Sequence, residues 1–110
     1  LLNYLFNKDL NNCLTITEYI YQLGTDIKLF TKQYINFMVN VIKYCVSKDI
    51  NLTNLNAQTV QLLSYDTKED INNLIKILNL FIKINNDIKY EQNPIILFQA
   101  NIINFVEEDL

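Results

Sequence analysis

Apolar residues recur every three or four positions along most of the chain, which is the spacing of one face of an α-helix. The first clear stripe predicts a helix of about 14 residues, and it consists of Leu10, Cys13, Leu14, Thr17, Ile20 and Tyr21. Gly24, the only glycine, follows where a helix end favours a left-handed residue. Because Thr25 or Asp26 then suits the next N-cap, the segment predicts a tight link between two antiparallel helices.

A second and longer stripe predicts a helix from about Ile27 to Val46. It consists of Ile27, Phe30, Tyr34, Phe37, Met38, Val41, Ile42 and Cys45. The polar segment Ser47–Asn56 then predicts a loop. Its apolar residues, which we expect to pack onto the core, are Ile50, Leu52 and Leu55. A short helix is expected at about Ala57 to Ser64.

The segment that begins at Asp66 has the pattern of a helix N-terminus, because Thr67 and Asp70 stand at capping-box spacing. A helix of about 20 residues follows. Its main predicted core stripe is Ile71, Leu74, Ile75, Leu78, Ile82 and Ile88. The apolar residues that widen this stripe are Ile77, Leu80, Phe81 and Ile84. A helix with so much apolar surface either lies at the centre of a bundle or is covered by a partner.

Asn93 and Pro94 predict the start of the last helix, since Asn is a good N-cap and Pro is favoured in the first turn. More than one face of this helix is again largely apolar. The residues that form these faces are Ile96, Leu97, Ala100, Asn101, Ile102, Ile103 and Phe105. The acidic residues 107–109 would oppose the helix dipole, so we expect them past the helix or at its frayed end. The predicted fold is therefore all-α: residues 1–110 form one compact bundle of five to six mostly antiparallel helices.

The composition excludes several kinds of chemistry. The chain has 17 Asn, 16 Ile, 16 Leu and nine Lys, but no His, Arg or Trp. There is consequently no imidazole base or metal ligand, no arginine fork for a phosphate and no glycine-rich phosphate loop. We expect no catalytic residue, cofactor site or metal site in this part of the chain. That includes the calcium-like series Asp49, Asn51, Thr53 and Asn54, which lacks a central Gly and a closing Glu.

Net charge and cysteine content limit the partners and the cellular location that we expect for this protein. The net charge is −3 and the lysines are spread along the chain, so direct nucleic-acid binding is not expected, although Lys28 and Lys32 form a small patch. Cys13 and Cys45 lie on apolar faces and are expected to be buried, reduced thiols, with one disulfide as the alternative. No apolar run reaches about 18 residues and no signal peptide is apparent, so we expect a cytoplasmic protein.

The order of short motifs resembles the C-terminal collar domain (domain III) of the gamma and tau subunits of bacterial DNA polymerase III, the clamp loader. The segments that carry the resemblance are residues 1–6, 8–10, 21–30, 35–41 and 88–97. The first four resemble the family's short apolar helix, a helix that ends in Gly, and a Gly-x-Asp link into an aromatic-bearing helix. Gly24 and Asp26 occupy the link.

The last of these segments resembles the family's long helix that closes in a Lys-aromatic pair, followed by a polar turn, Pro and an apolar helix. Lys89 and Tyr90 occupy the pair, and Pro94 the proline. The family commonly carries Arg after this Pro and Glu four residues later, where this sequence has Ile95 and Gln99.

The resemblance implies an oligomerisation scaffold that holds clamp-loader subunits in a ring for DNA replication. The AAA+ ATPase part, with its ATP and magnesium, would lie N-terminal to this chain in a longer protein, which agrees with the missing initiator Met. The parent would be a component of a DNA-directed DNA polymerase, and the expected partners are the gamma/tau, delta and delta-prime subunits, bound through helical surfaces without membrane contact. The alternative is a stand-alone helical adaptor or regulator that binds a partner through an apolar groove.

Overall fold

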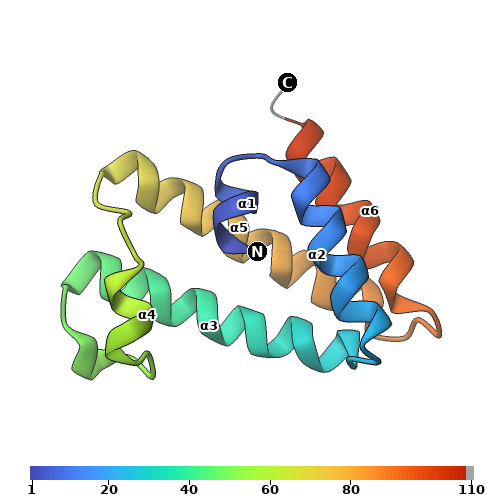
Figure 1. The fold of residues 1–110 in the computed structure, drawn as a ribbon, viewed down its shortest axis with the longest axis horizontal. Coiled ribbons are helices and arrows are strands. Elements are labelled where there is room, and N and C mark those ends of the chain that lie inside the picture. The colour runs from blue at the N-terminus through green and yellow to red at the C-terminus, as the bar shows by residue number, and fades with distance from the viewer. Residues whose placement is uncertain (109–110) are drawn as a thin grey trace.

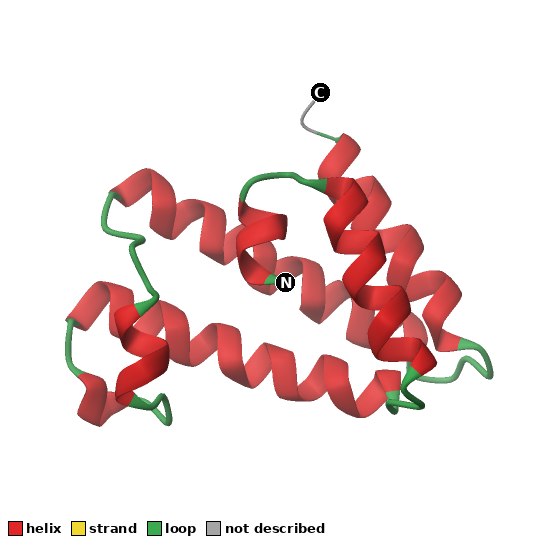
Figure 2. Ribbon diagram, in the orientation of Figure 1, coloured by secondary structure: helices red, strands yellow, loops and turns green. Residues whose placement is uncertain are grey.

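The computed structural model describes residues 1–108, and this part of the chain folds into helices without any β-strand (Figure 2). The elements are α1 (Leu2–Phe6), α2 (Leu10–Gln22), α3 (Ile27–Ser47), the short 3-10 helix η1 (Ile50–Leu52), α4 (Ala57–Gln61), α5 (Lys68–Ile88) and α6 (Pro94–Glu107). The prediction of a compact all-α bundle is confirmed.

The two longest helices, α3 and α5, run antiparallel and form the base of the molecule (Figure 1). Helix α6 packs on both of them, α2 packs on α6, and α1 contacts α2 and α5. Figure 1 shows α2 and α6 side by side at the end where α3 begins and α5 finishes. The bundle therefore has two layers, with the α3–α5 pair in one and α1, α2 and α6 in the other.

The core lies between these two layers. Its largest fully buried side chains include Leu5, Met38, Leu74, Ile77, Phe81, Ile84, Phe98 and Ile102. The ring centroid of Phe81 on α5 lies 4.4 Å from that of Tyr34 on α3 and 5.9 Å from that of Phe98 on α6. Aromatic packing thus joins three helices at one point, which adds to the apolar area that they bury.

Most predicted helix ends are confirmed. Gly24 has a φ of 81°, and the Asp26 side chain accepts a hydrogen bond from the Leu29 N–H at 3.2 Å. Thr67 and Asp70 form the predicted capping box. Asn93 stands at the N-cap of α6 with Pro94 in the first turn, but the Asn93 side chain makes no capping bond.

The inward face of α5 differs from the prediction. The buried residues are Leu74, Ile77, Leu80, Phe81, Ile84 and Ile88. Ile75 and Ile82, both predicted to lie in the core, are instead 40% and 41% exposed. Leu74 and Ile88 are buried as predicted. The four residues that were expected only to widen the core are buried with them, and one of these, Phe81, meets Tyr34 of α3 and Phe98 of α6.

Three smaller expectations also change. Helix α4 ends at Gln61, before Ser64, and Leu52 is 54% exposed instead of packed on the core. Glu107 is the last residue of α6, and Asp109 lies outside the described residues.

Cys13 and Cys45 are buried and free, which confirms the prediction of two reduced thiols over that of a disulfide.

Candidate interaction surface

An apolar groove opens to solvent between α3, η1 and α5. Its volume is about 400 Å³, and its surface is almost wholly hydrophobic. The residues that line it, and that define the α3–α5 groove, are Val39, Ile42, Lys43, Val46, Ser47, Leu52 and Leu78. Such a surface on an isolated domain marks a place where another molecule can exclude water.

Exposed apolar residues follow a regular spacing on both helices of the groove. On α3, Val39 is 37% exposed and Val46 is 66% exposed, one heptad apart with Ile42 between them. On α5, Ile75 and Ile82 are also one heptad apart and stand on either side of Leu78. Residues at this spacing share one face of a helix, so two apolar stripes run beside each other on the outside of the bundle.

Local contacts fix the end of the groove that η1 forms. Lys48 takes a left-handed conformation with a φ of 59° and ends α3, which turns the chain back toward its own helix. The Asn40 side chain then accepts a hydrogen bond from the Asn54 N–H at 3.3 Å. The Asp49 carboxylate accepts one from the Asn51 N–H at 3.0 Å. These bonds hold η1 against α3, so Leu52 contributes to the wall of the groove.

The charges of α3 have a single sign. Helix α3 contains Lys28, Lys32 and Lys43 and no Asp or Glu. Lys43 lines the α3–α5 groove directly. Lys28 donates a hydrogen bond to the Lys89 carbonyl oxygen at 3.3 Å, and this bond ties the start of α3 to the end of α5.

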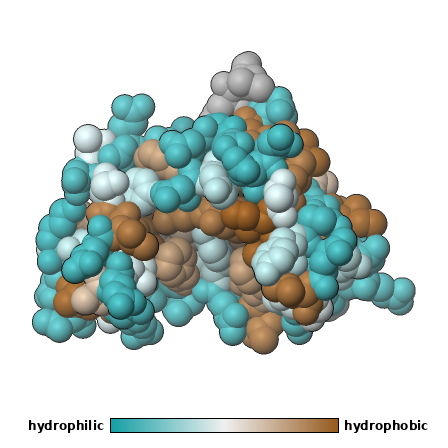
Figure 3. Space-filling model, in the orientation of Figure 1, coloured by the Kyte–Doolittle hydropathy of each residue, from teal (hydrophilic) through white to brown (hydrophobic). Residues whose placement is uncertain are grey.

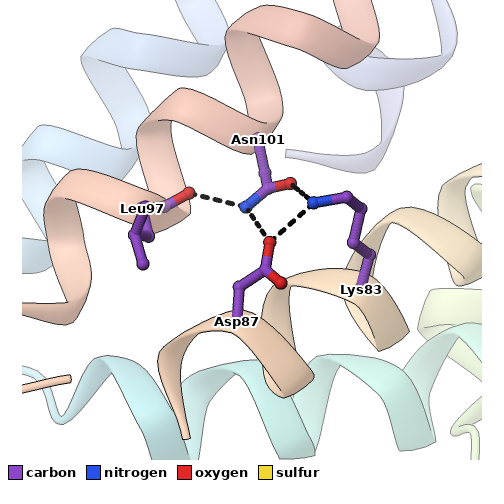
Figure 4. A network of polar contacts seen from close by, with 4 residues as sticks. All are labelled: Lys83, Asp87, Leu97 and Asn101. Atoms are coloured by element: carbon purple, nitrogen blue, oxygen red, sulfur yellow. Dashed lines mark hydrogen bonds and ion pairs between the residues drawn. The ribbon is translucent and has the colours of Figure 1, made fainter. Parts of the chain in front are cut away.

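A polar network joins α5 to α6 on another side of α5 (Figure 4). Lys83 lies 2.6 Å from Asp87 and donates to the Asn101 side chain at 2.9 Å. Asn101 in turn donates to the Asp87 carboxylate at 3.1 Å and to the Leu97 carbonyl oxygen at 2.9 Å. The bonds from Lys83 and Asn101 lower the pKa of Asp87. Each polar group is satisfied by another helix residue, so the network serves to align the two helices.

Two other clefts contain polar groups. A cleft of about 840 Å³ between α5 and α6 includes Lys76, Lys83 and Glu107, so both signs of charge face it. A groove of about 640 Å³ between α2 and α6 includes Glu18 and Gln99. Neither cleft has the almost wholly apolar surface of the α3–α5 groove.

Helix α6 carries Ile95 and Gln99, the two residues at which the sequence departs from the collar pattern. Ile95 is buried in the core, where a charged side chain would have no room. Gln99 reaches across to α2 and donates to the Glu18 carboxylate at 3.0 Å and to the Thr17 hydroxyl at 3.3 Å. The bond from Gln99, and then one from Gln22, lowers the pKa of Glu18. A hydrogen bond thus links α2 and α6 at this position.

The residues singled out from the sequence lie at helix ends and not in the groove. Gly24, Asp26, Asn93 and Pro94 start or finish helices, as described above. Lys89 is the C-cap of α5, and the neighbouring Tyr90 is strongly exposed. They position the elements and do not form a binding site of their own.

Sequence reasoning missed the surface role of Val39 and Val46. The available signal was a second heptad-like series on α3, with Ile35, Val39, Ile42 and Val46 at steps of four, three and four. On α5 the excess apolar surface was recognised, but the outward stripe was assigned to the core. The groove depends on which stripe turns inward, and helical spacing alone leaves that choice open.

None of the helices within residues 1–108 is both long and apolar enough to cross a bilayer. Within the same residues, no three Cys, Asp or Glu side chains gather in a way that could hold a metal ion. Comparison of the chain with family models, curated proteins and solved structures finds no match.

Proposed function

We propose that this domain is a helical scaffold that joins protein subunits through the α3–α5 groove. The carrying observation is the pair of exposed apolar stripes, Val39 to Val46 on α3 and Ile75 to Ile82 on α5. Removing apolar surface from water favours association by roughly 25 cal/mol per Å². Leu78 is the residue of α5 that meets the α3 stripe in the groove, and Ile75 and Ile82 flank it on the same helix. Both stripes lie on helices that pack extensively on each other, so a partner would meet a preformed surface.

The resemblance to the clamp-loader collar gives this proposal its specific form. In that form the partners are the gamma/tau, delta and delta-prime subunits, and ATP hydrolysis takes place in an ATPase part N-terminal to this domain. The order of elements supports it: a helix that ends at Gly24, a helix capped by Asp26, and a final helix that begins at Pro94. The stand-alone adaptor is the alternative, and the same groove would serve it.

The coding sequence upstream of Leu1 separates the two forms without a structure. The collar form requires a phosphate-binding loop with a Gly-Lys-Ser/Thr ending in the same reading frame, well before this domain. A reading frame that starts at or near Leu1 would contradict the collar form and would support the stand-alone adaptor.

Association can be measured by light scattering after the domain is mixed with purified delta and delta-prime subunits from the same source. Tens of micromolar of each protein suit the weak affinity of an isolated domain. We expect a complex with the wild-type chain and a loss of that complex with Val46→Asp, which puts a charge into the groove. Leu62→Asp is the matched control, because Leu62 is 78% exposed and follows α4, outside the groove.

The two variants separate a specific loss from a general one. Both substituted side chains are largely exposed, so both proteins should keep the wild-type circular dichroism and melting temperature. Equal loss of the complex with both variants would contradict a role for the groove. Absence of any complex with the wild-type chain would contradict the collar form.

A further inference from the structure

Three lysines lie on the outer side of α3, and one of them, Lys43, is in the α3–α5 groove. Lys43 lines the groove, and Lys32 precedes it by 11 residues, which returns to almost the same face of the helix after three turns. Lys28 stands one turn before Lys32 on that face. At 1.5 Å per residue, Lys32 and Lys43 lie about 16 Å apart along the helix axis. The groove therefore has an apolar floor with Lys43 at its edge, and Lys32 continues the line of positive charge along α3 beyond the groove. Lys32 and Lys43 together form the lysine rim.

Four carboxylates of the elements around the groove are engaged in other bonds, and the first, Asp49, accepts the Asn51 N–H at 3.0 Å. Asp66 pairs with Lys48 at 2.6 Å, beyond the end of α3. Asp70 accepts the Asp66 and Thr67 N–H groups in the capping box of α5. Asp87 belongs to the network that faces α6. Lys32 and Lys43 form none of the ion pairs found in residues 1–108, although the whole chain carries a net charge of −3.

We infer that the occupant of the α3–α5 groove is an amphipathic helix whose apolar stripe is flanked by Asp or Glu residues about three turns apart. This inference rests on the proposed scaffold function and names the chemistry of its partner. The apolar floor would take the stripe, while Lys32 and Lys43 would each face one carboxylate. An 11-residue spacing on the partner helix matches the spacing of the two lysines.

Two copies of this chain do not fit each other groove to groove. The groove of the second copy would present the same lysine rim and the same helix α3 without any carboxylate. Such a pairing would bring like charges together, which opposes association.

The chemistry can be tested directly with the 110-residue chain and designed peptides. The probe is a fluorescein-labelled amphipathic helical peptide with Leu at positions i, i+4, i+7 and i+11 and flanking Glu residues 11 positions apart. The control peptide has the same Leu positions with Lys in place of Glu. By fluorescence anisotropy we expect the acidic peptide to bind at least about tenfold more tightly, with an advantage that shrinks as salt rises.

Charge-reversal variants locate the effect on the protein. Lys43→Glu and Lys32→Glu should each weaken binding of the acidic peptide by about tenfold or more. Lys76→Glu makes the same charge change on the surface of α5 that lines the cleft facing α6, and should leave the affinity unchanged. Equal affinities for the two peptides, or equal effects of Lys43→Glu and Lys76→Glu, would overturn the inference.

Lipid membranes and nucleic acids are also anionic and are the alternative ligands of the lysine rim. Vesicles of phosphatidylcholine with phosphatidylserine, and a short single-stranded oligonucleotide, test lipid and nucleic acid by sedimentation and by anisotropy. Binding to either that exceeds binding to the acidic peptide would overturn the inference in favour of that surface. If the delta subunits bind while charge reversal at Lys32 and Lys43 has no effect, the result supports the scaffold function and contradicts the acidic partner helix.

If the acidic peptide binds but the delta and delta-prime subunits do not, the result contradicts only the collar form of the proposed function.

Discussion

Asn101 is the most buried member of the polar network between α5 and α6, with only 6% of its surface exposed. Its amide donates to one neighbour on α6 and to Asp87 on α5, and its oxygen accepts from Lys83. A buried amide that satisfies both its donor and acceptor groups in this way fixes the relative positions of two helices. We therefore regard it as the main polar determinant of how α6 sits on α5.

The network makes stability depend on acid pH. Hydrogen bonds from Lys83, and then from Asn101, lower the pKa of Asp87 below its unfolded value. A carboxyl whose pKa is lowered by folding stabilises the protein above the unfolded pKa of about 3.9. That contribution is lost as the pH falls through the folded value. The melting temperature of Asp87→Asn should therefore fall less than that of the wild type between neutral pH and about pH 3.

Glu69→Gln is the control for this experiment, since it removes a carboxylate from the same helix without touching the network. Thermal melts followed by circular dichroism over that pH range supply the measurement. A pH dependence of Asp87→Asn that equals that of the wild type would show that the network adds nothing to stability.

Both cysteines act as packing residues with little reactivity. Cys13 is fully buried, and burial raises its pKa to about 11, with Asp9 adding to the effect. Burial also raises the pKa of Cys45. Near pH 8, only about one Cys13 side chain in a thousand would be the reactive thiolate. We expect a thiol reagent to label the folded protein slowly and both thiols of the denatured protein at once.

Single Cys13→Ser and Cys45→Ser variants assign the slow reactions to their thiols. Fast labelling of one thiol in the folded chain would mean that its helix opens easily. For Cys45 this would concern α3 itself, which forms half of the groove.

At the scale of elements, two helix N-termini with similar sequence signals differ in their bonds. The Asp26 side chain caps α3 through the Leu29 N–H, whereas the Asn93 side chain caps nothing at α6. Loss of a capping bond costs about 1 kcal/mol. We therefore expect Asp26→Ala to lower the free energy of unfolding by about that amount. Asn93→Ala should change it by less than about half as much.

Urea denaturation of the two variants and the wild type provides the comparison, with midpoints converted through a common slope. Equal losses would mean that Asn93 rotates to cap α6 in solution. A null effect at Asp26 would instead mean that water replaces its carboxylate at no cost.

Signals held by neighbouring residues predicted the helix ends well. Gly24 with Asp26, and Thr67 with Asp70, identify their ends because the stabilising bonds join residues within one turn of each other. Helix α4 was predicted too long, and its Ala57–Gln61 turn has no buried residue to extend it.

The orientation of α5 could not be read from spacing. Two apolar stripes run along this helix at equally good intervals, one through Leu74, Ile77 and Ile84 and one through Ile75 and Ile82. The choice between them is made by aromatic residues of α3 and α6, which pack around Phe81. The position of the candidate groove follows from that choice. The sequence therefore predicts an excess of apolar surface on α5 but not which stripe of it faces outward.

At the scale of the whole molecule, the two sides of the α3–α5 helix pair have different surroundings. One side packs against α1, α2 and α6 and holds the core. The other carries the apolar groove with its lysine rim. Hydrophobic atoms also remain visible between the helices on the face shown in Figure 3, so the bundle buries only part of its apolar surface.

Adjacent residues of α5 test this two-sided arrangement most directly. Leu74 is fully buried and Ile75 is 40% exposed, because neighbouring residues point about 100° apart on a helix. Leu74→Asp places a carboxylate in the core at a cost of several kcal/mol, against a total stability of about 5–15 kcal/mol. We expect this variant to unfold or to melt far below the wild type. Ile75→Asp keeps its carboxylate in water, so it should change the stability by less than about 1 kcal/mol.

The same pair of variants links the fold to the proposed function. Circular dichroism melts measure stability, and the light-scattering assay measures association with a partner. Ile75→Asp should stay folded yet bind less well, since it places a negative charge beside the apolar floor that Leu78 helps to form. If Ile75→Asp unfolds while Leu74→Asp is tolerated, α5 is rotated by about one residue from the orientation described. The outward stripe, and the groove built on it, would then be wrong together.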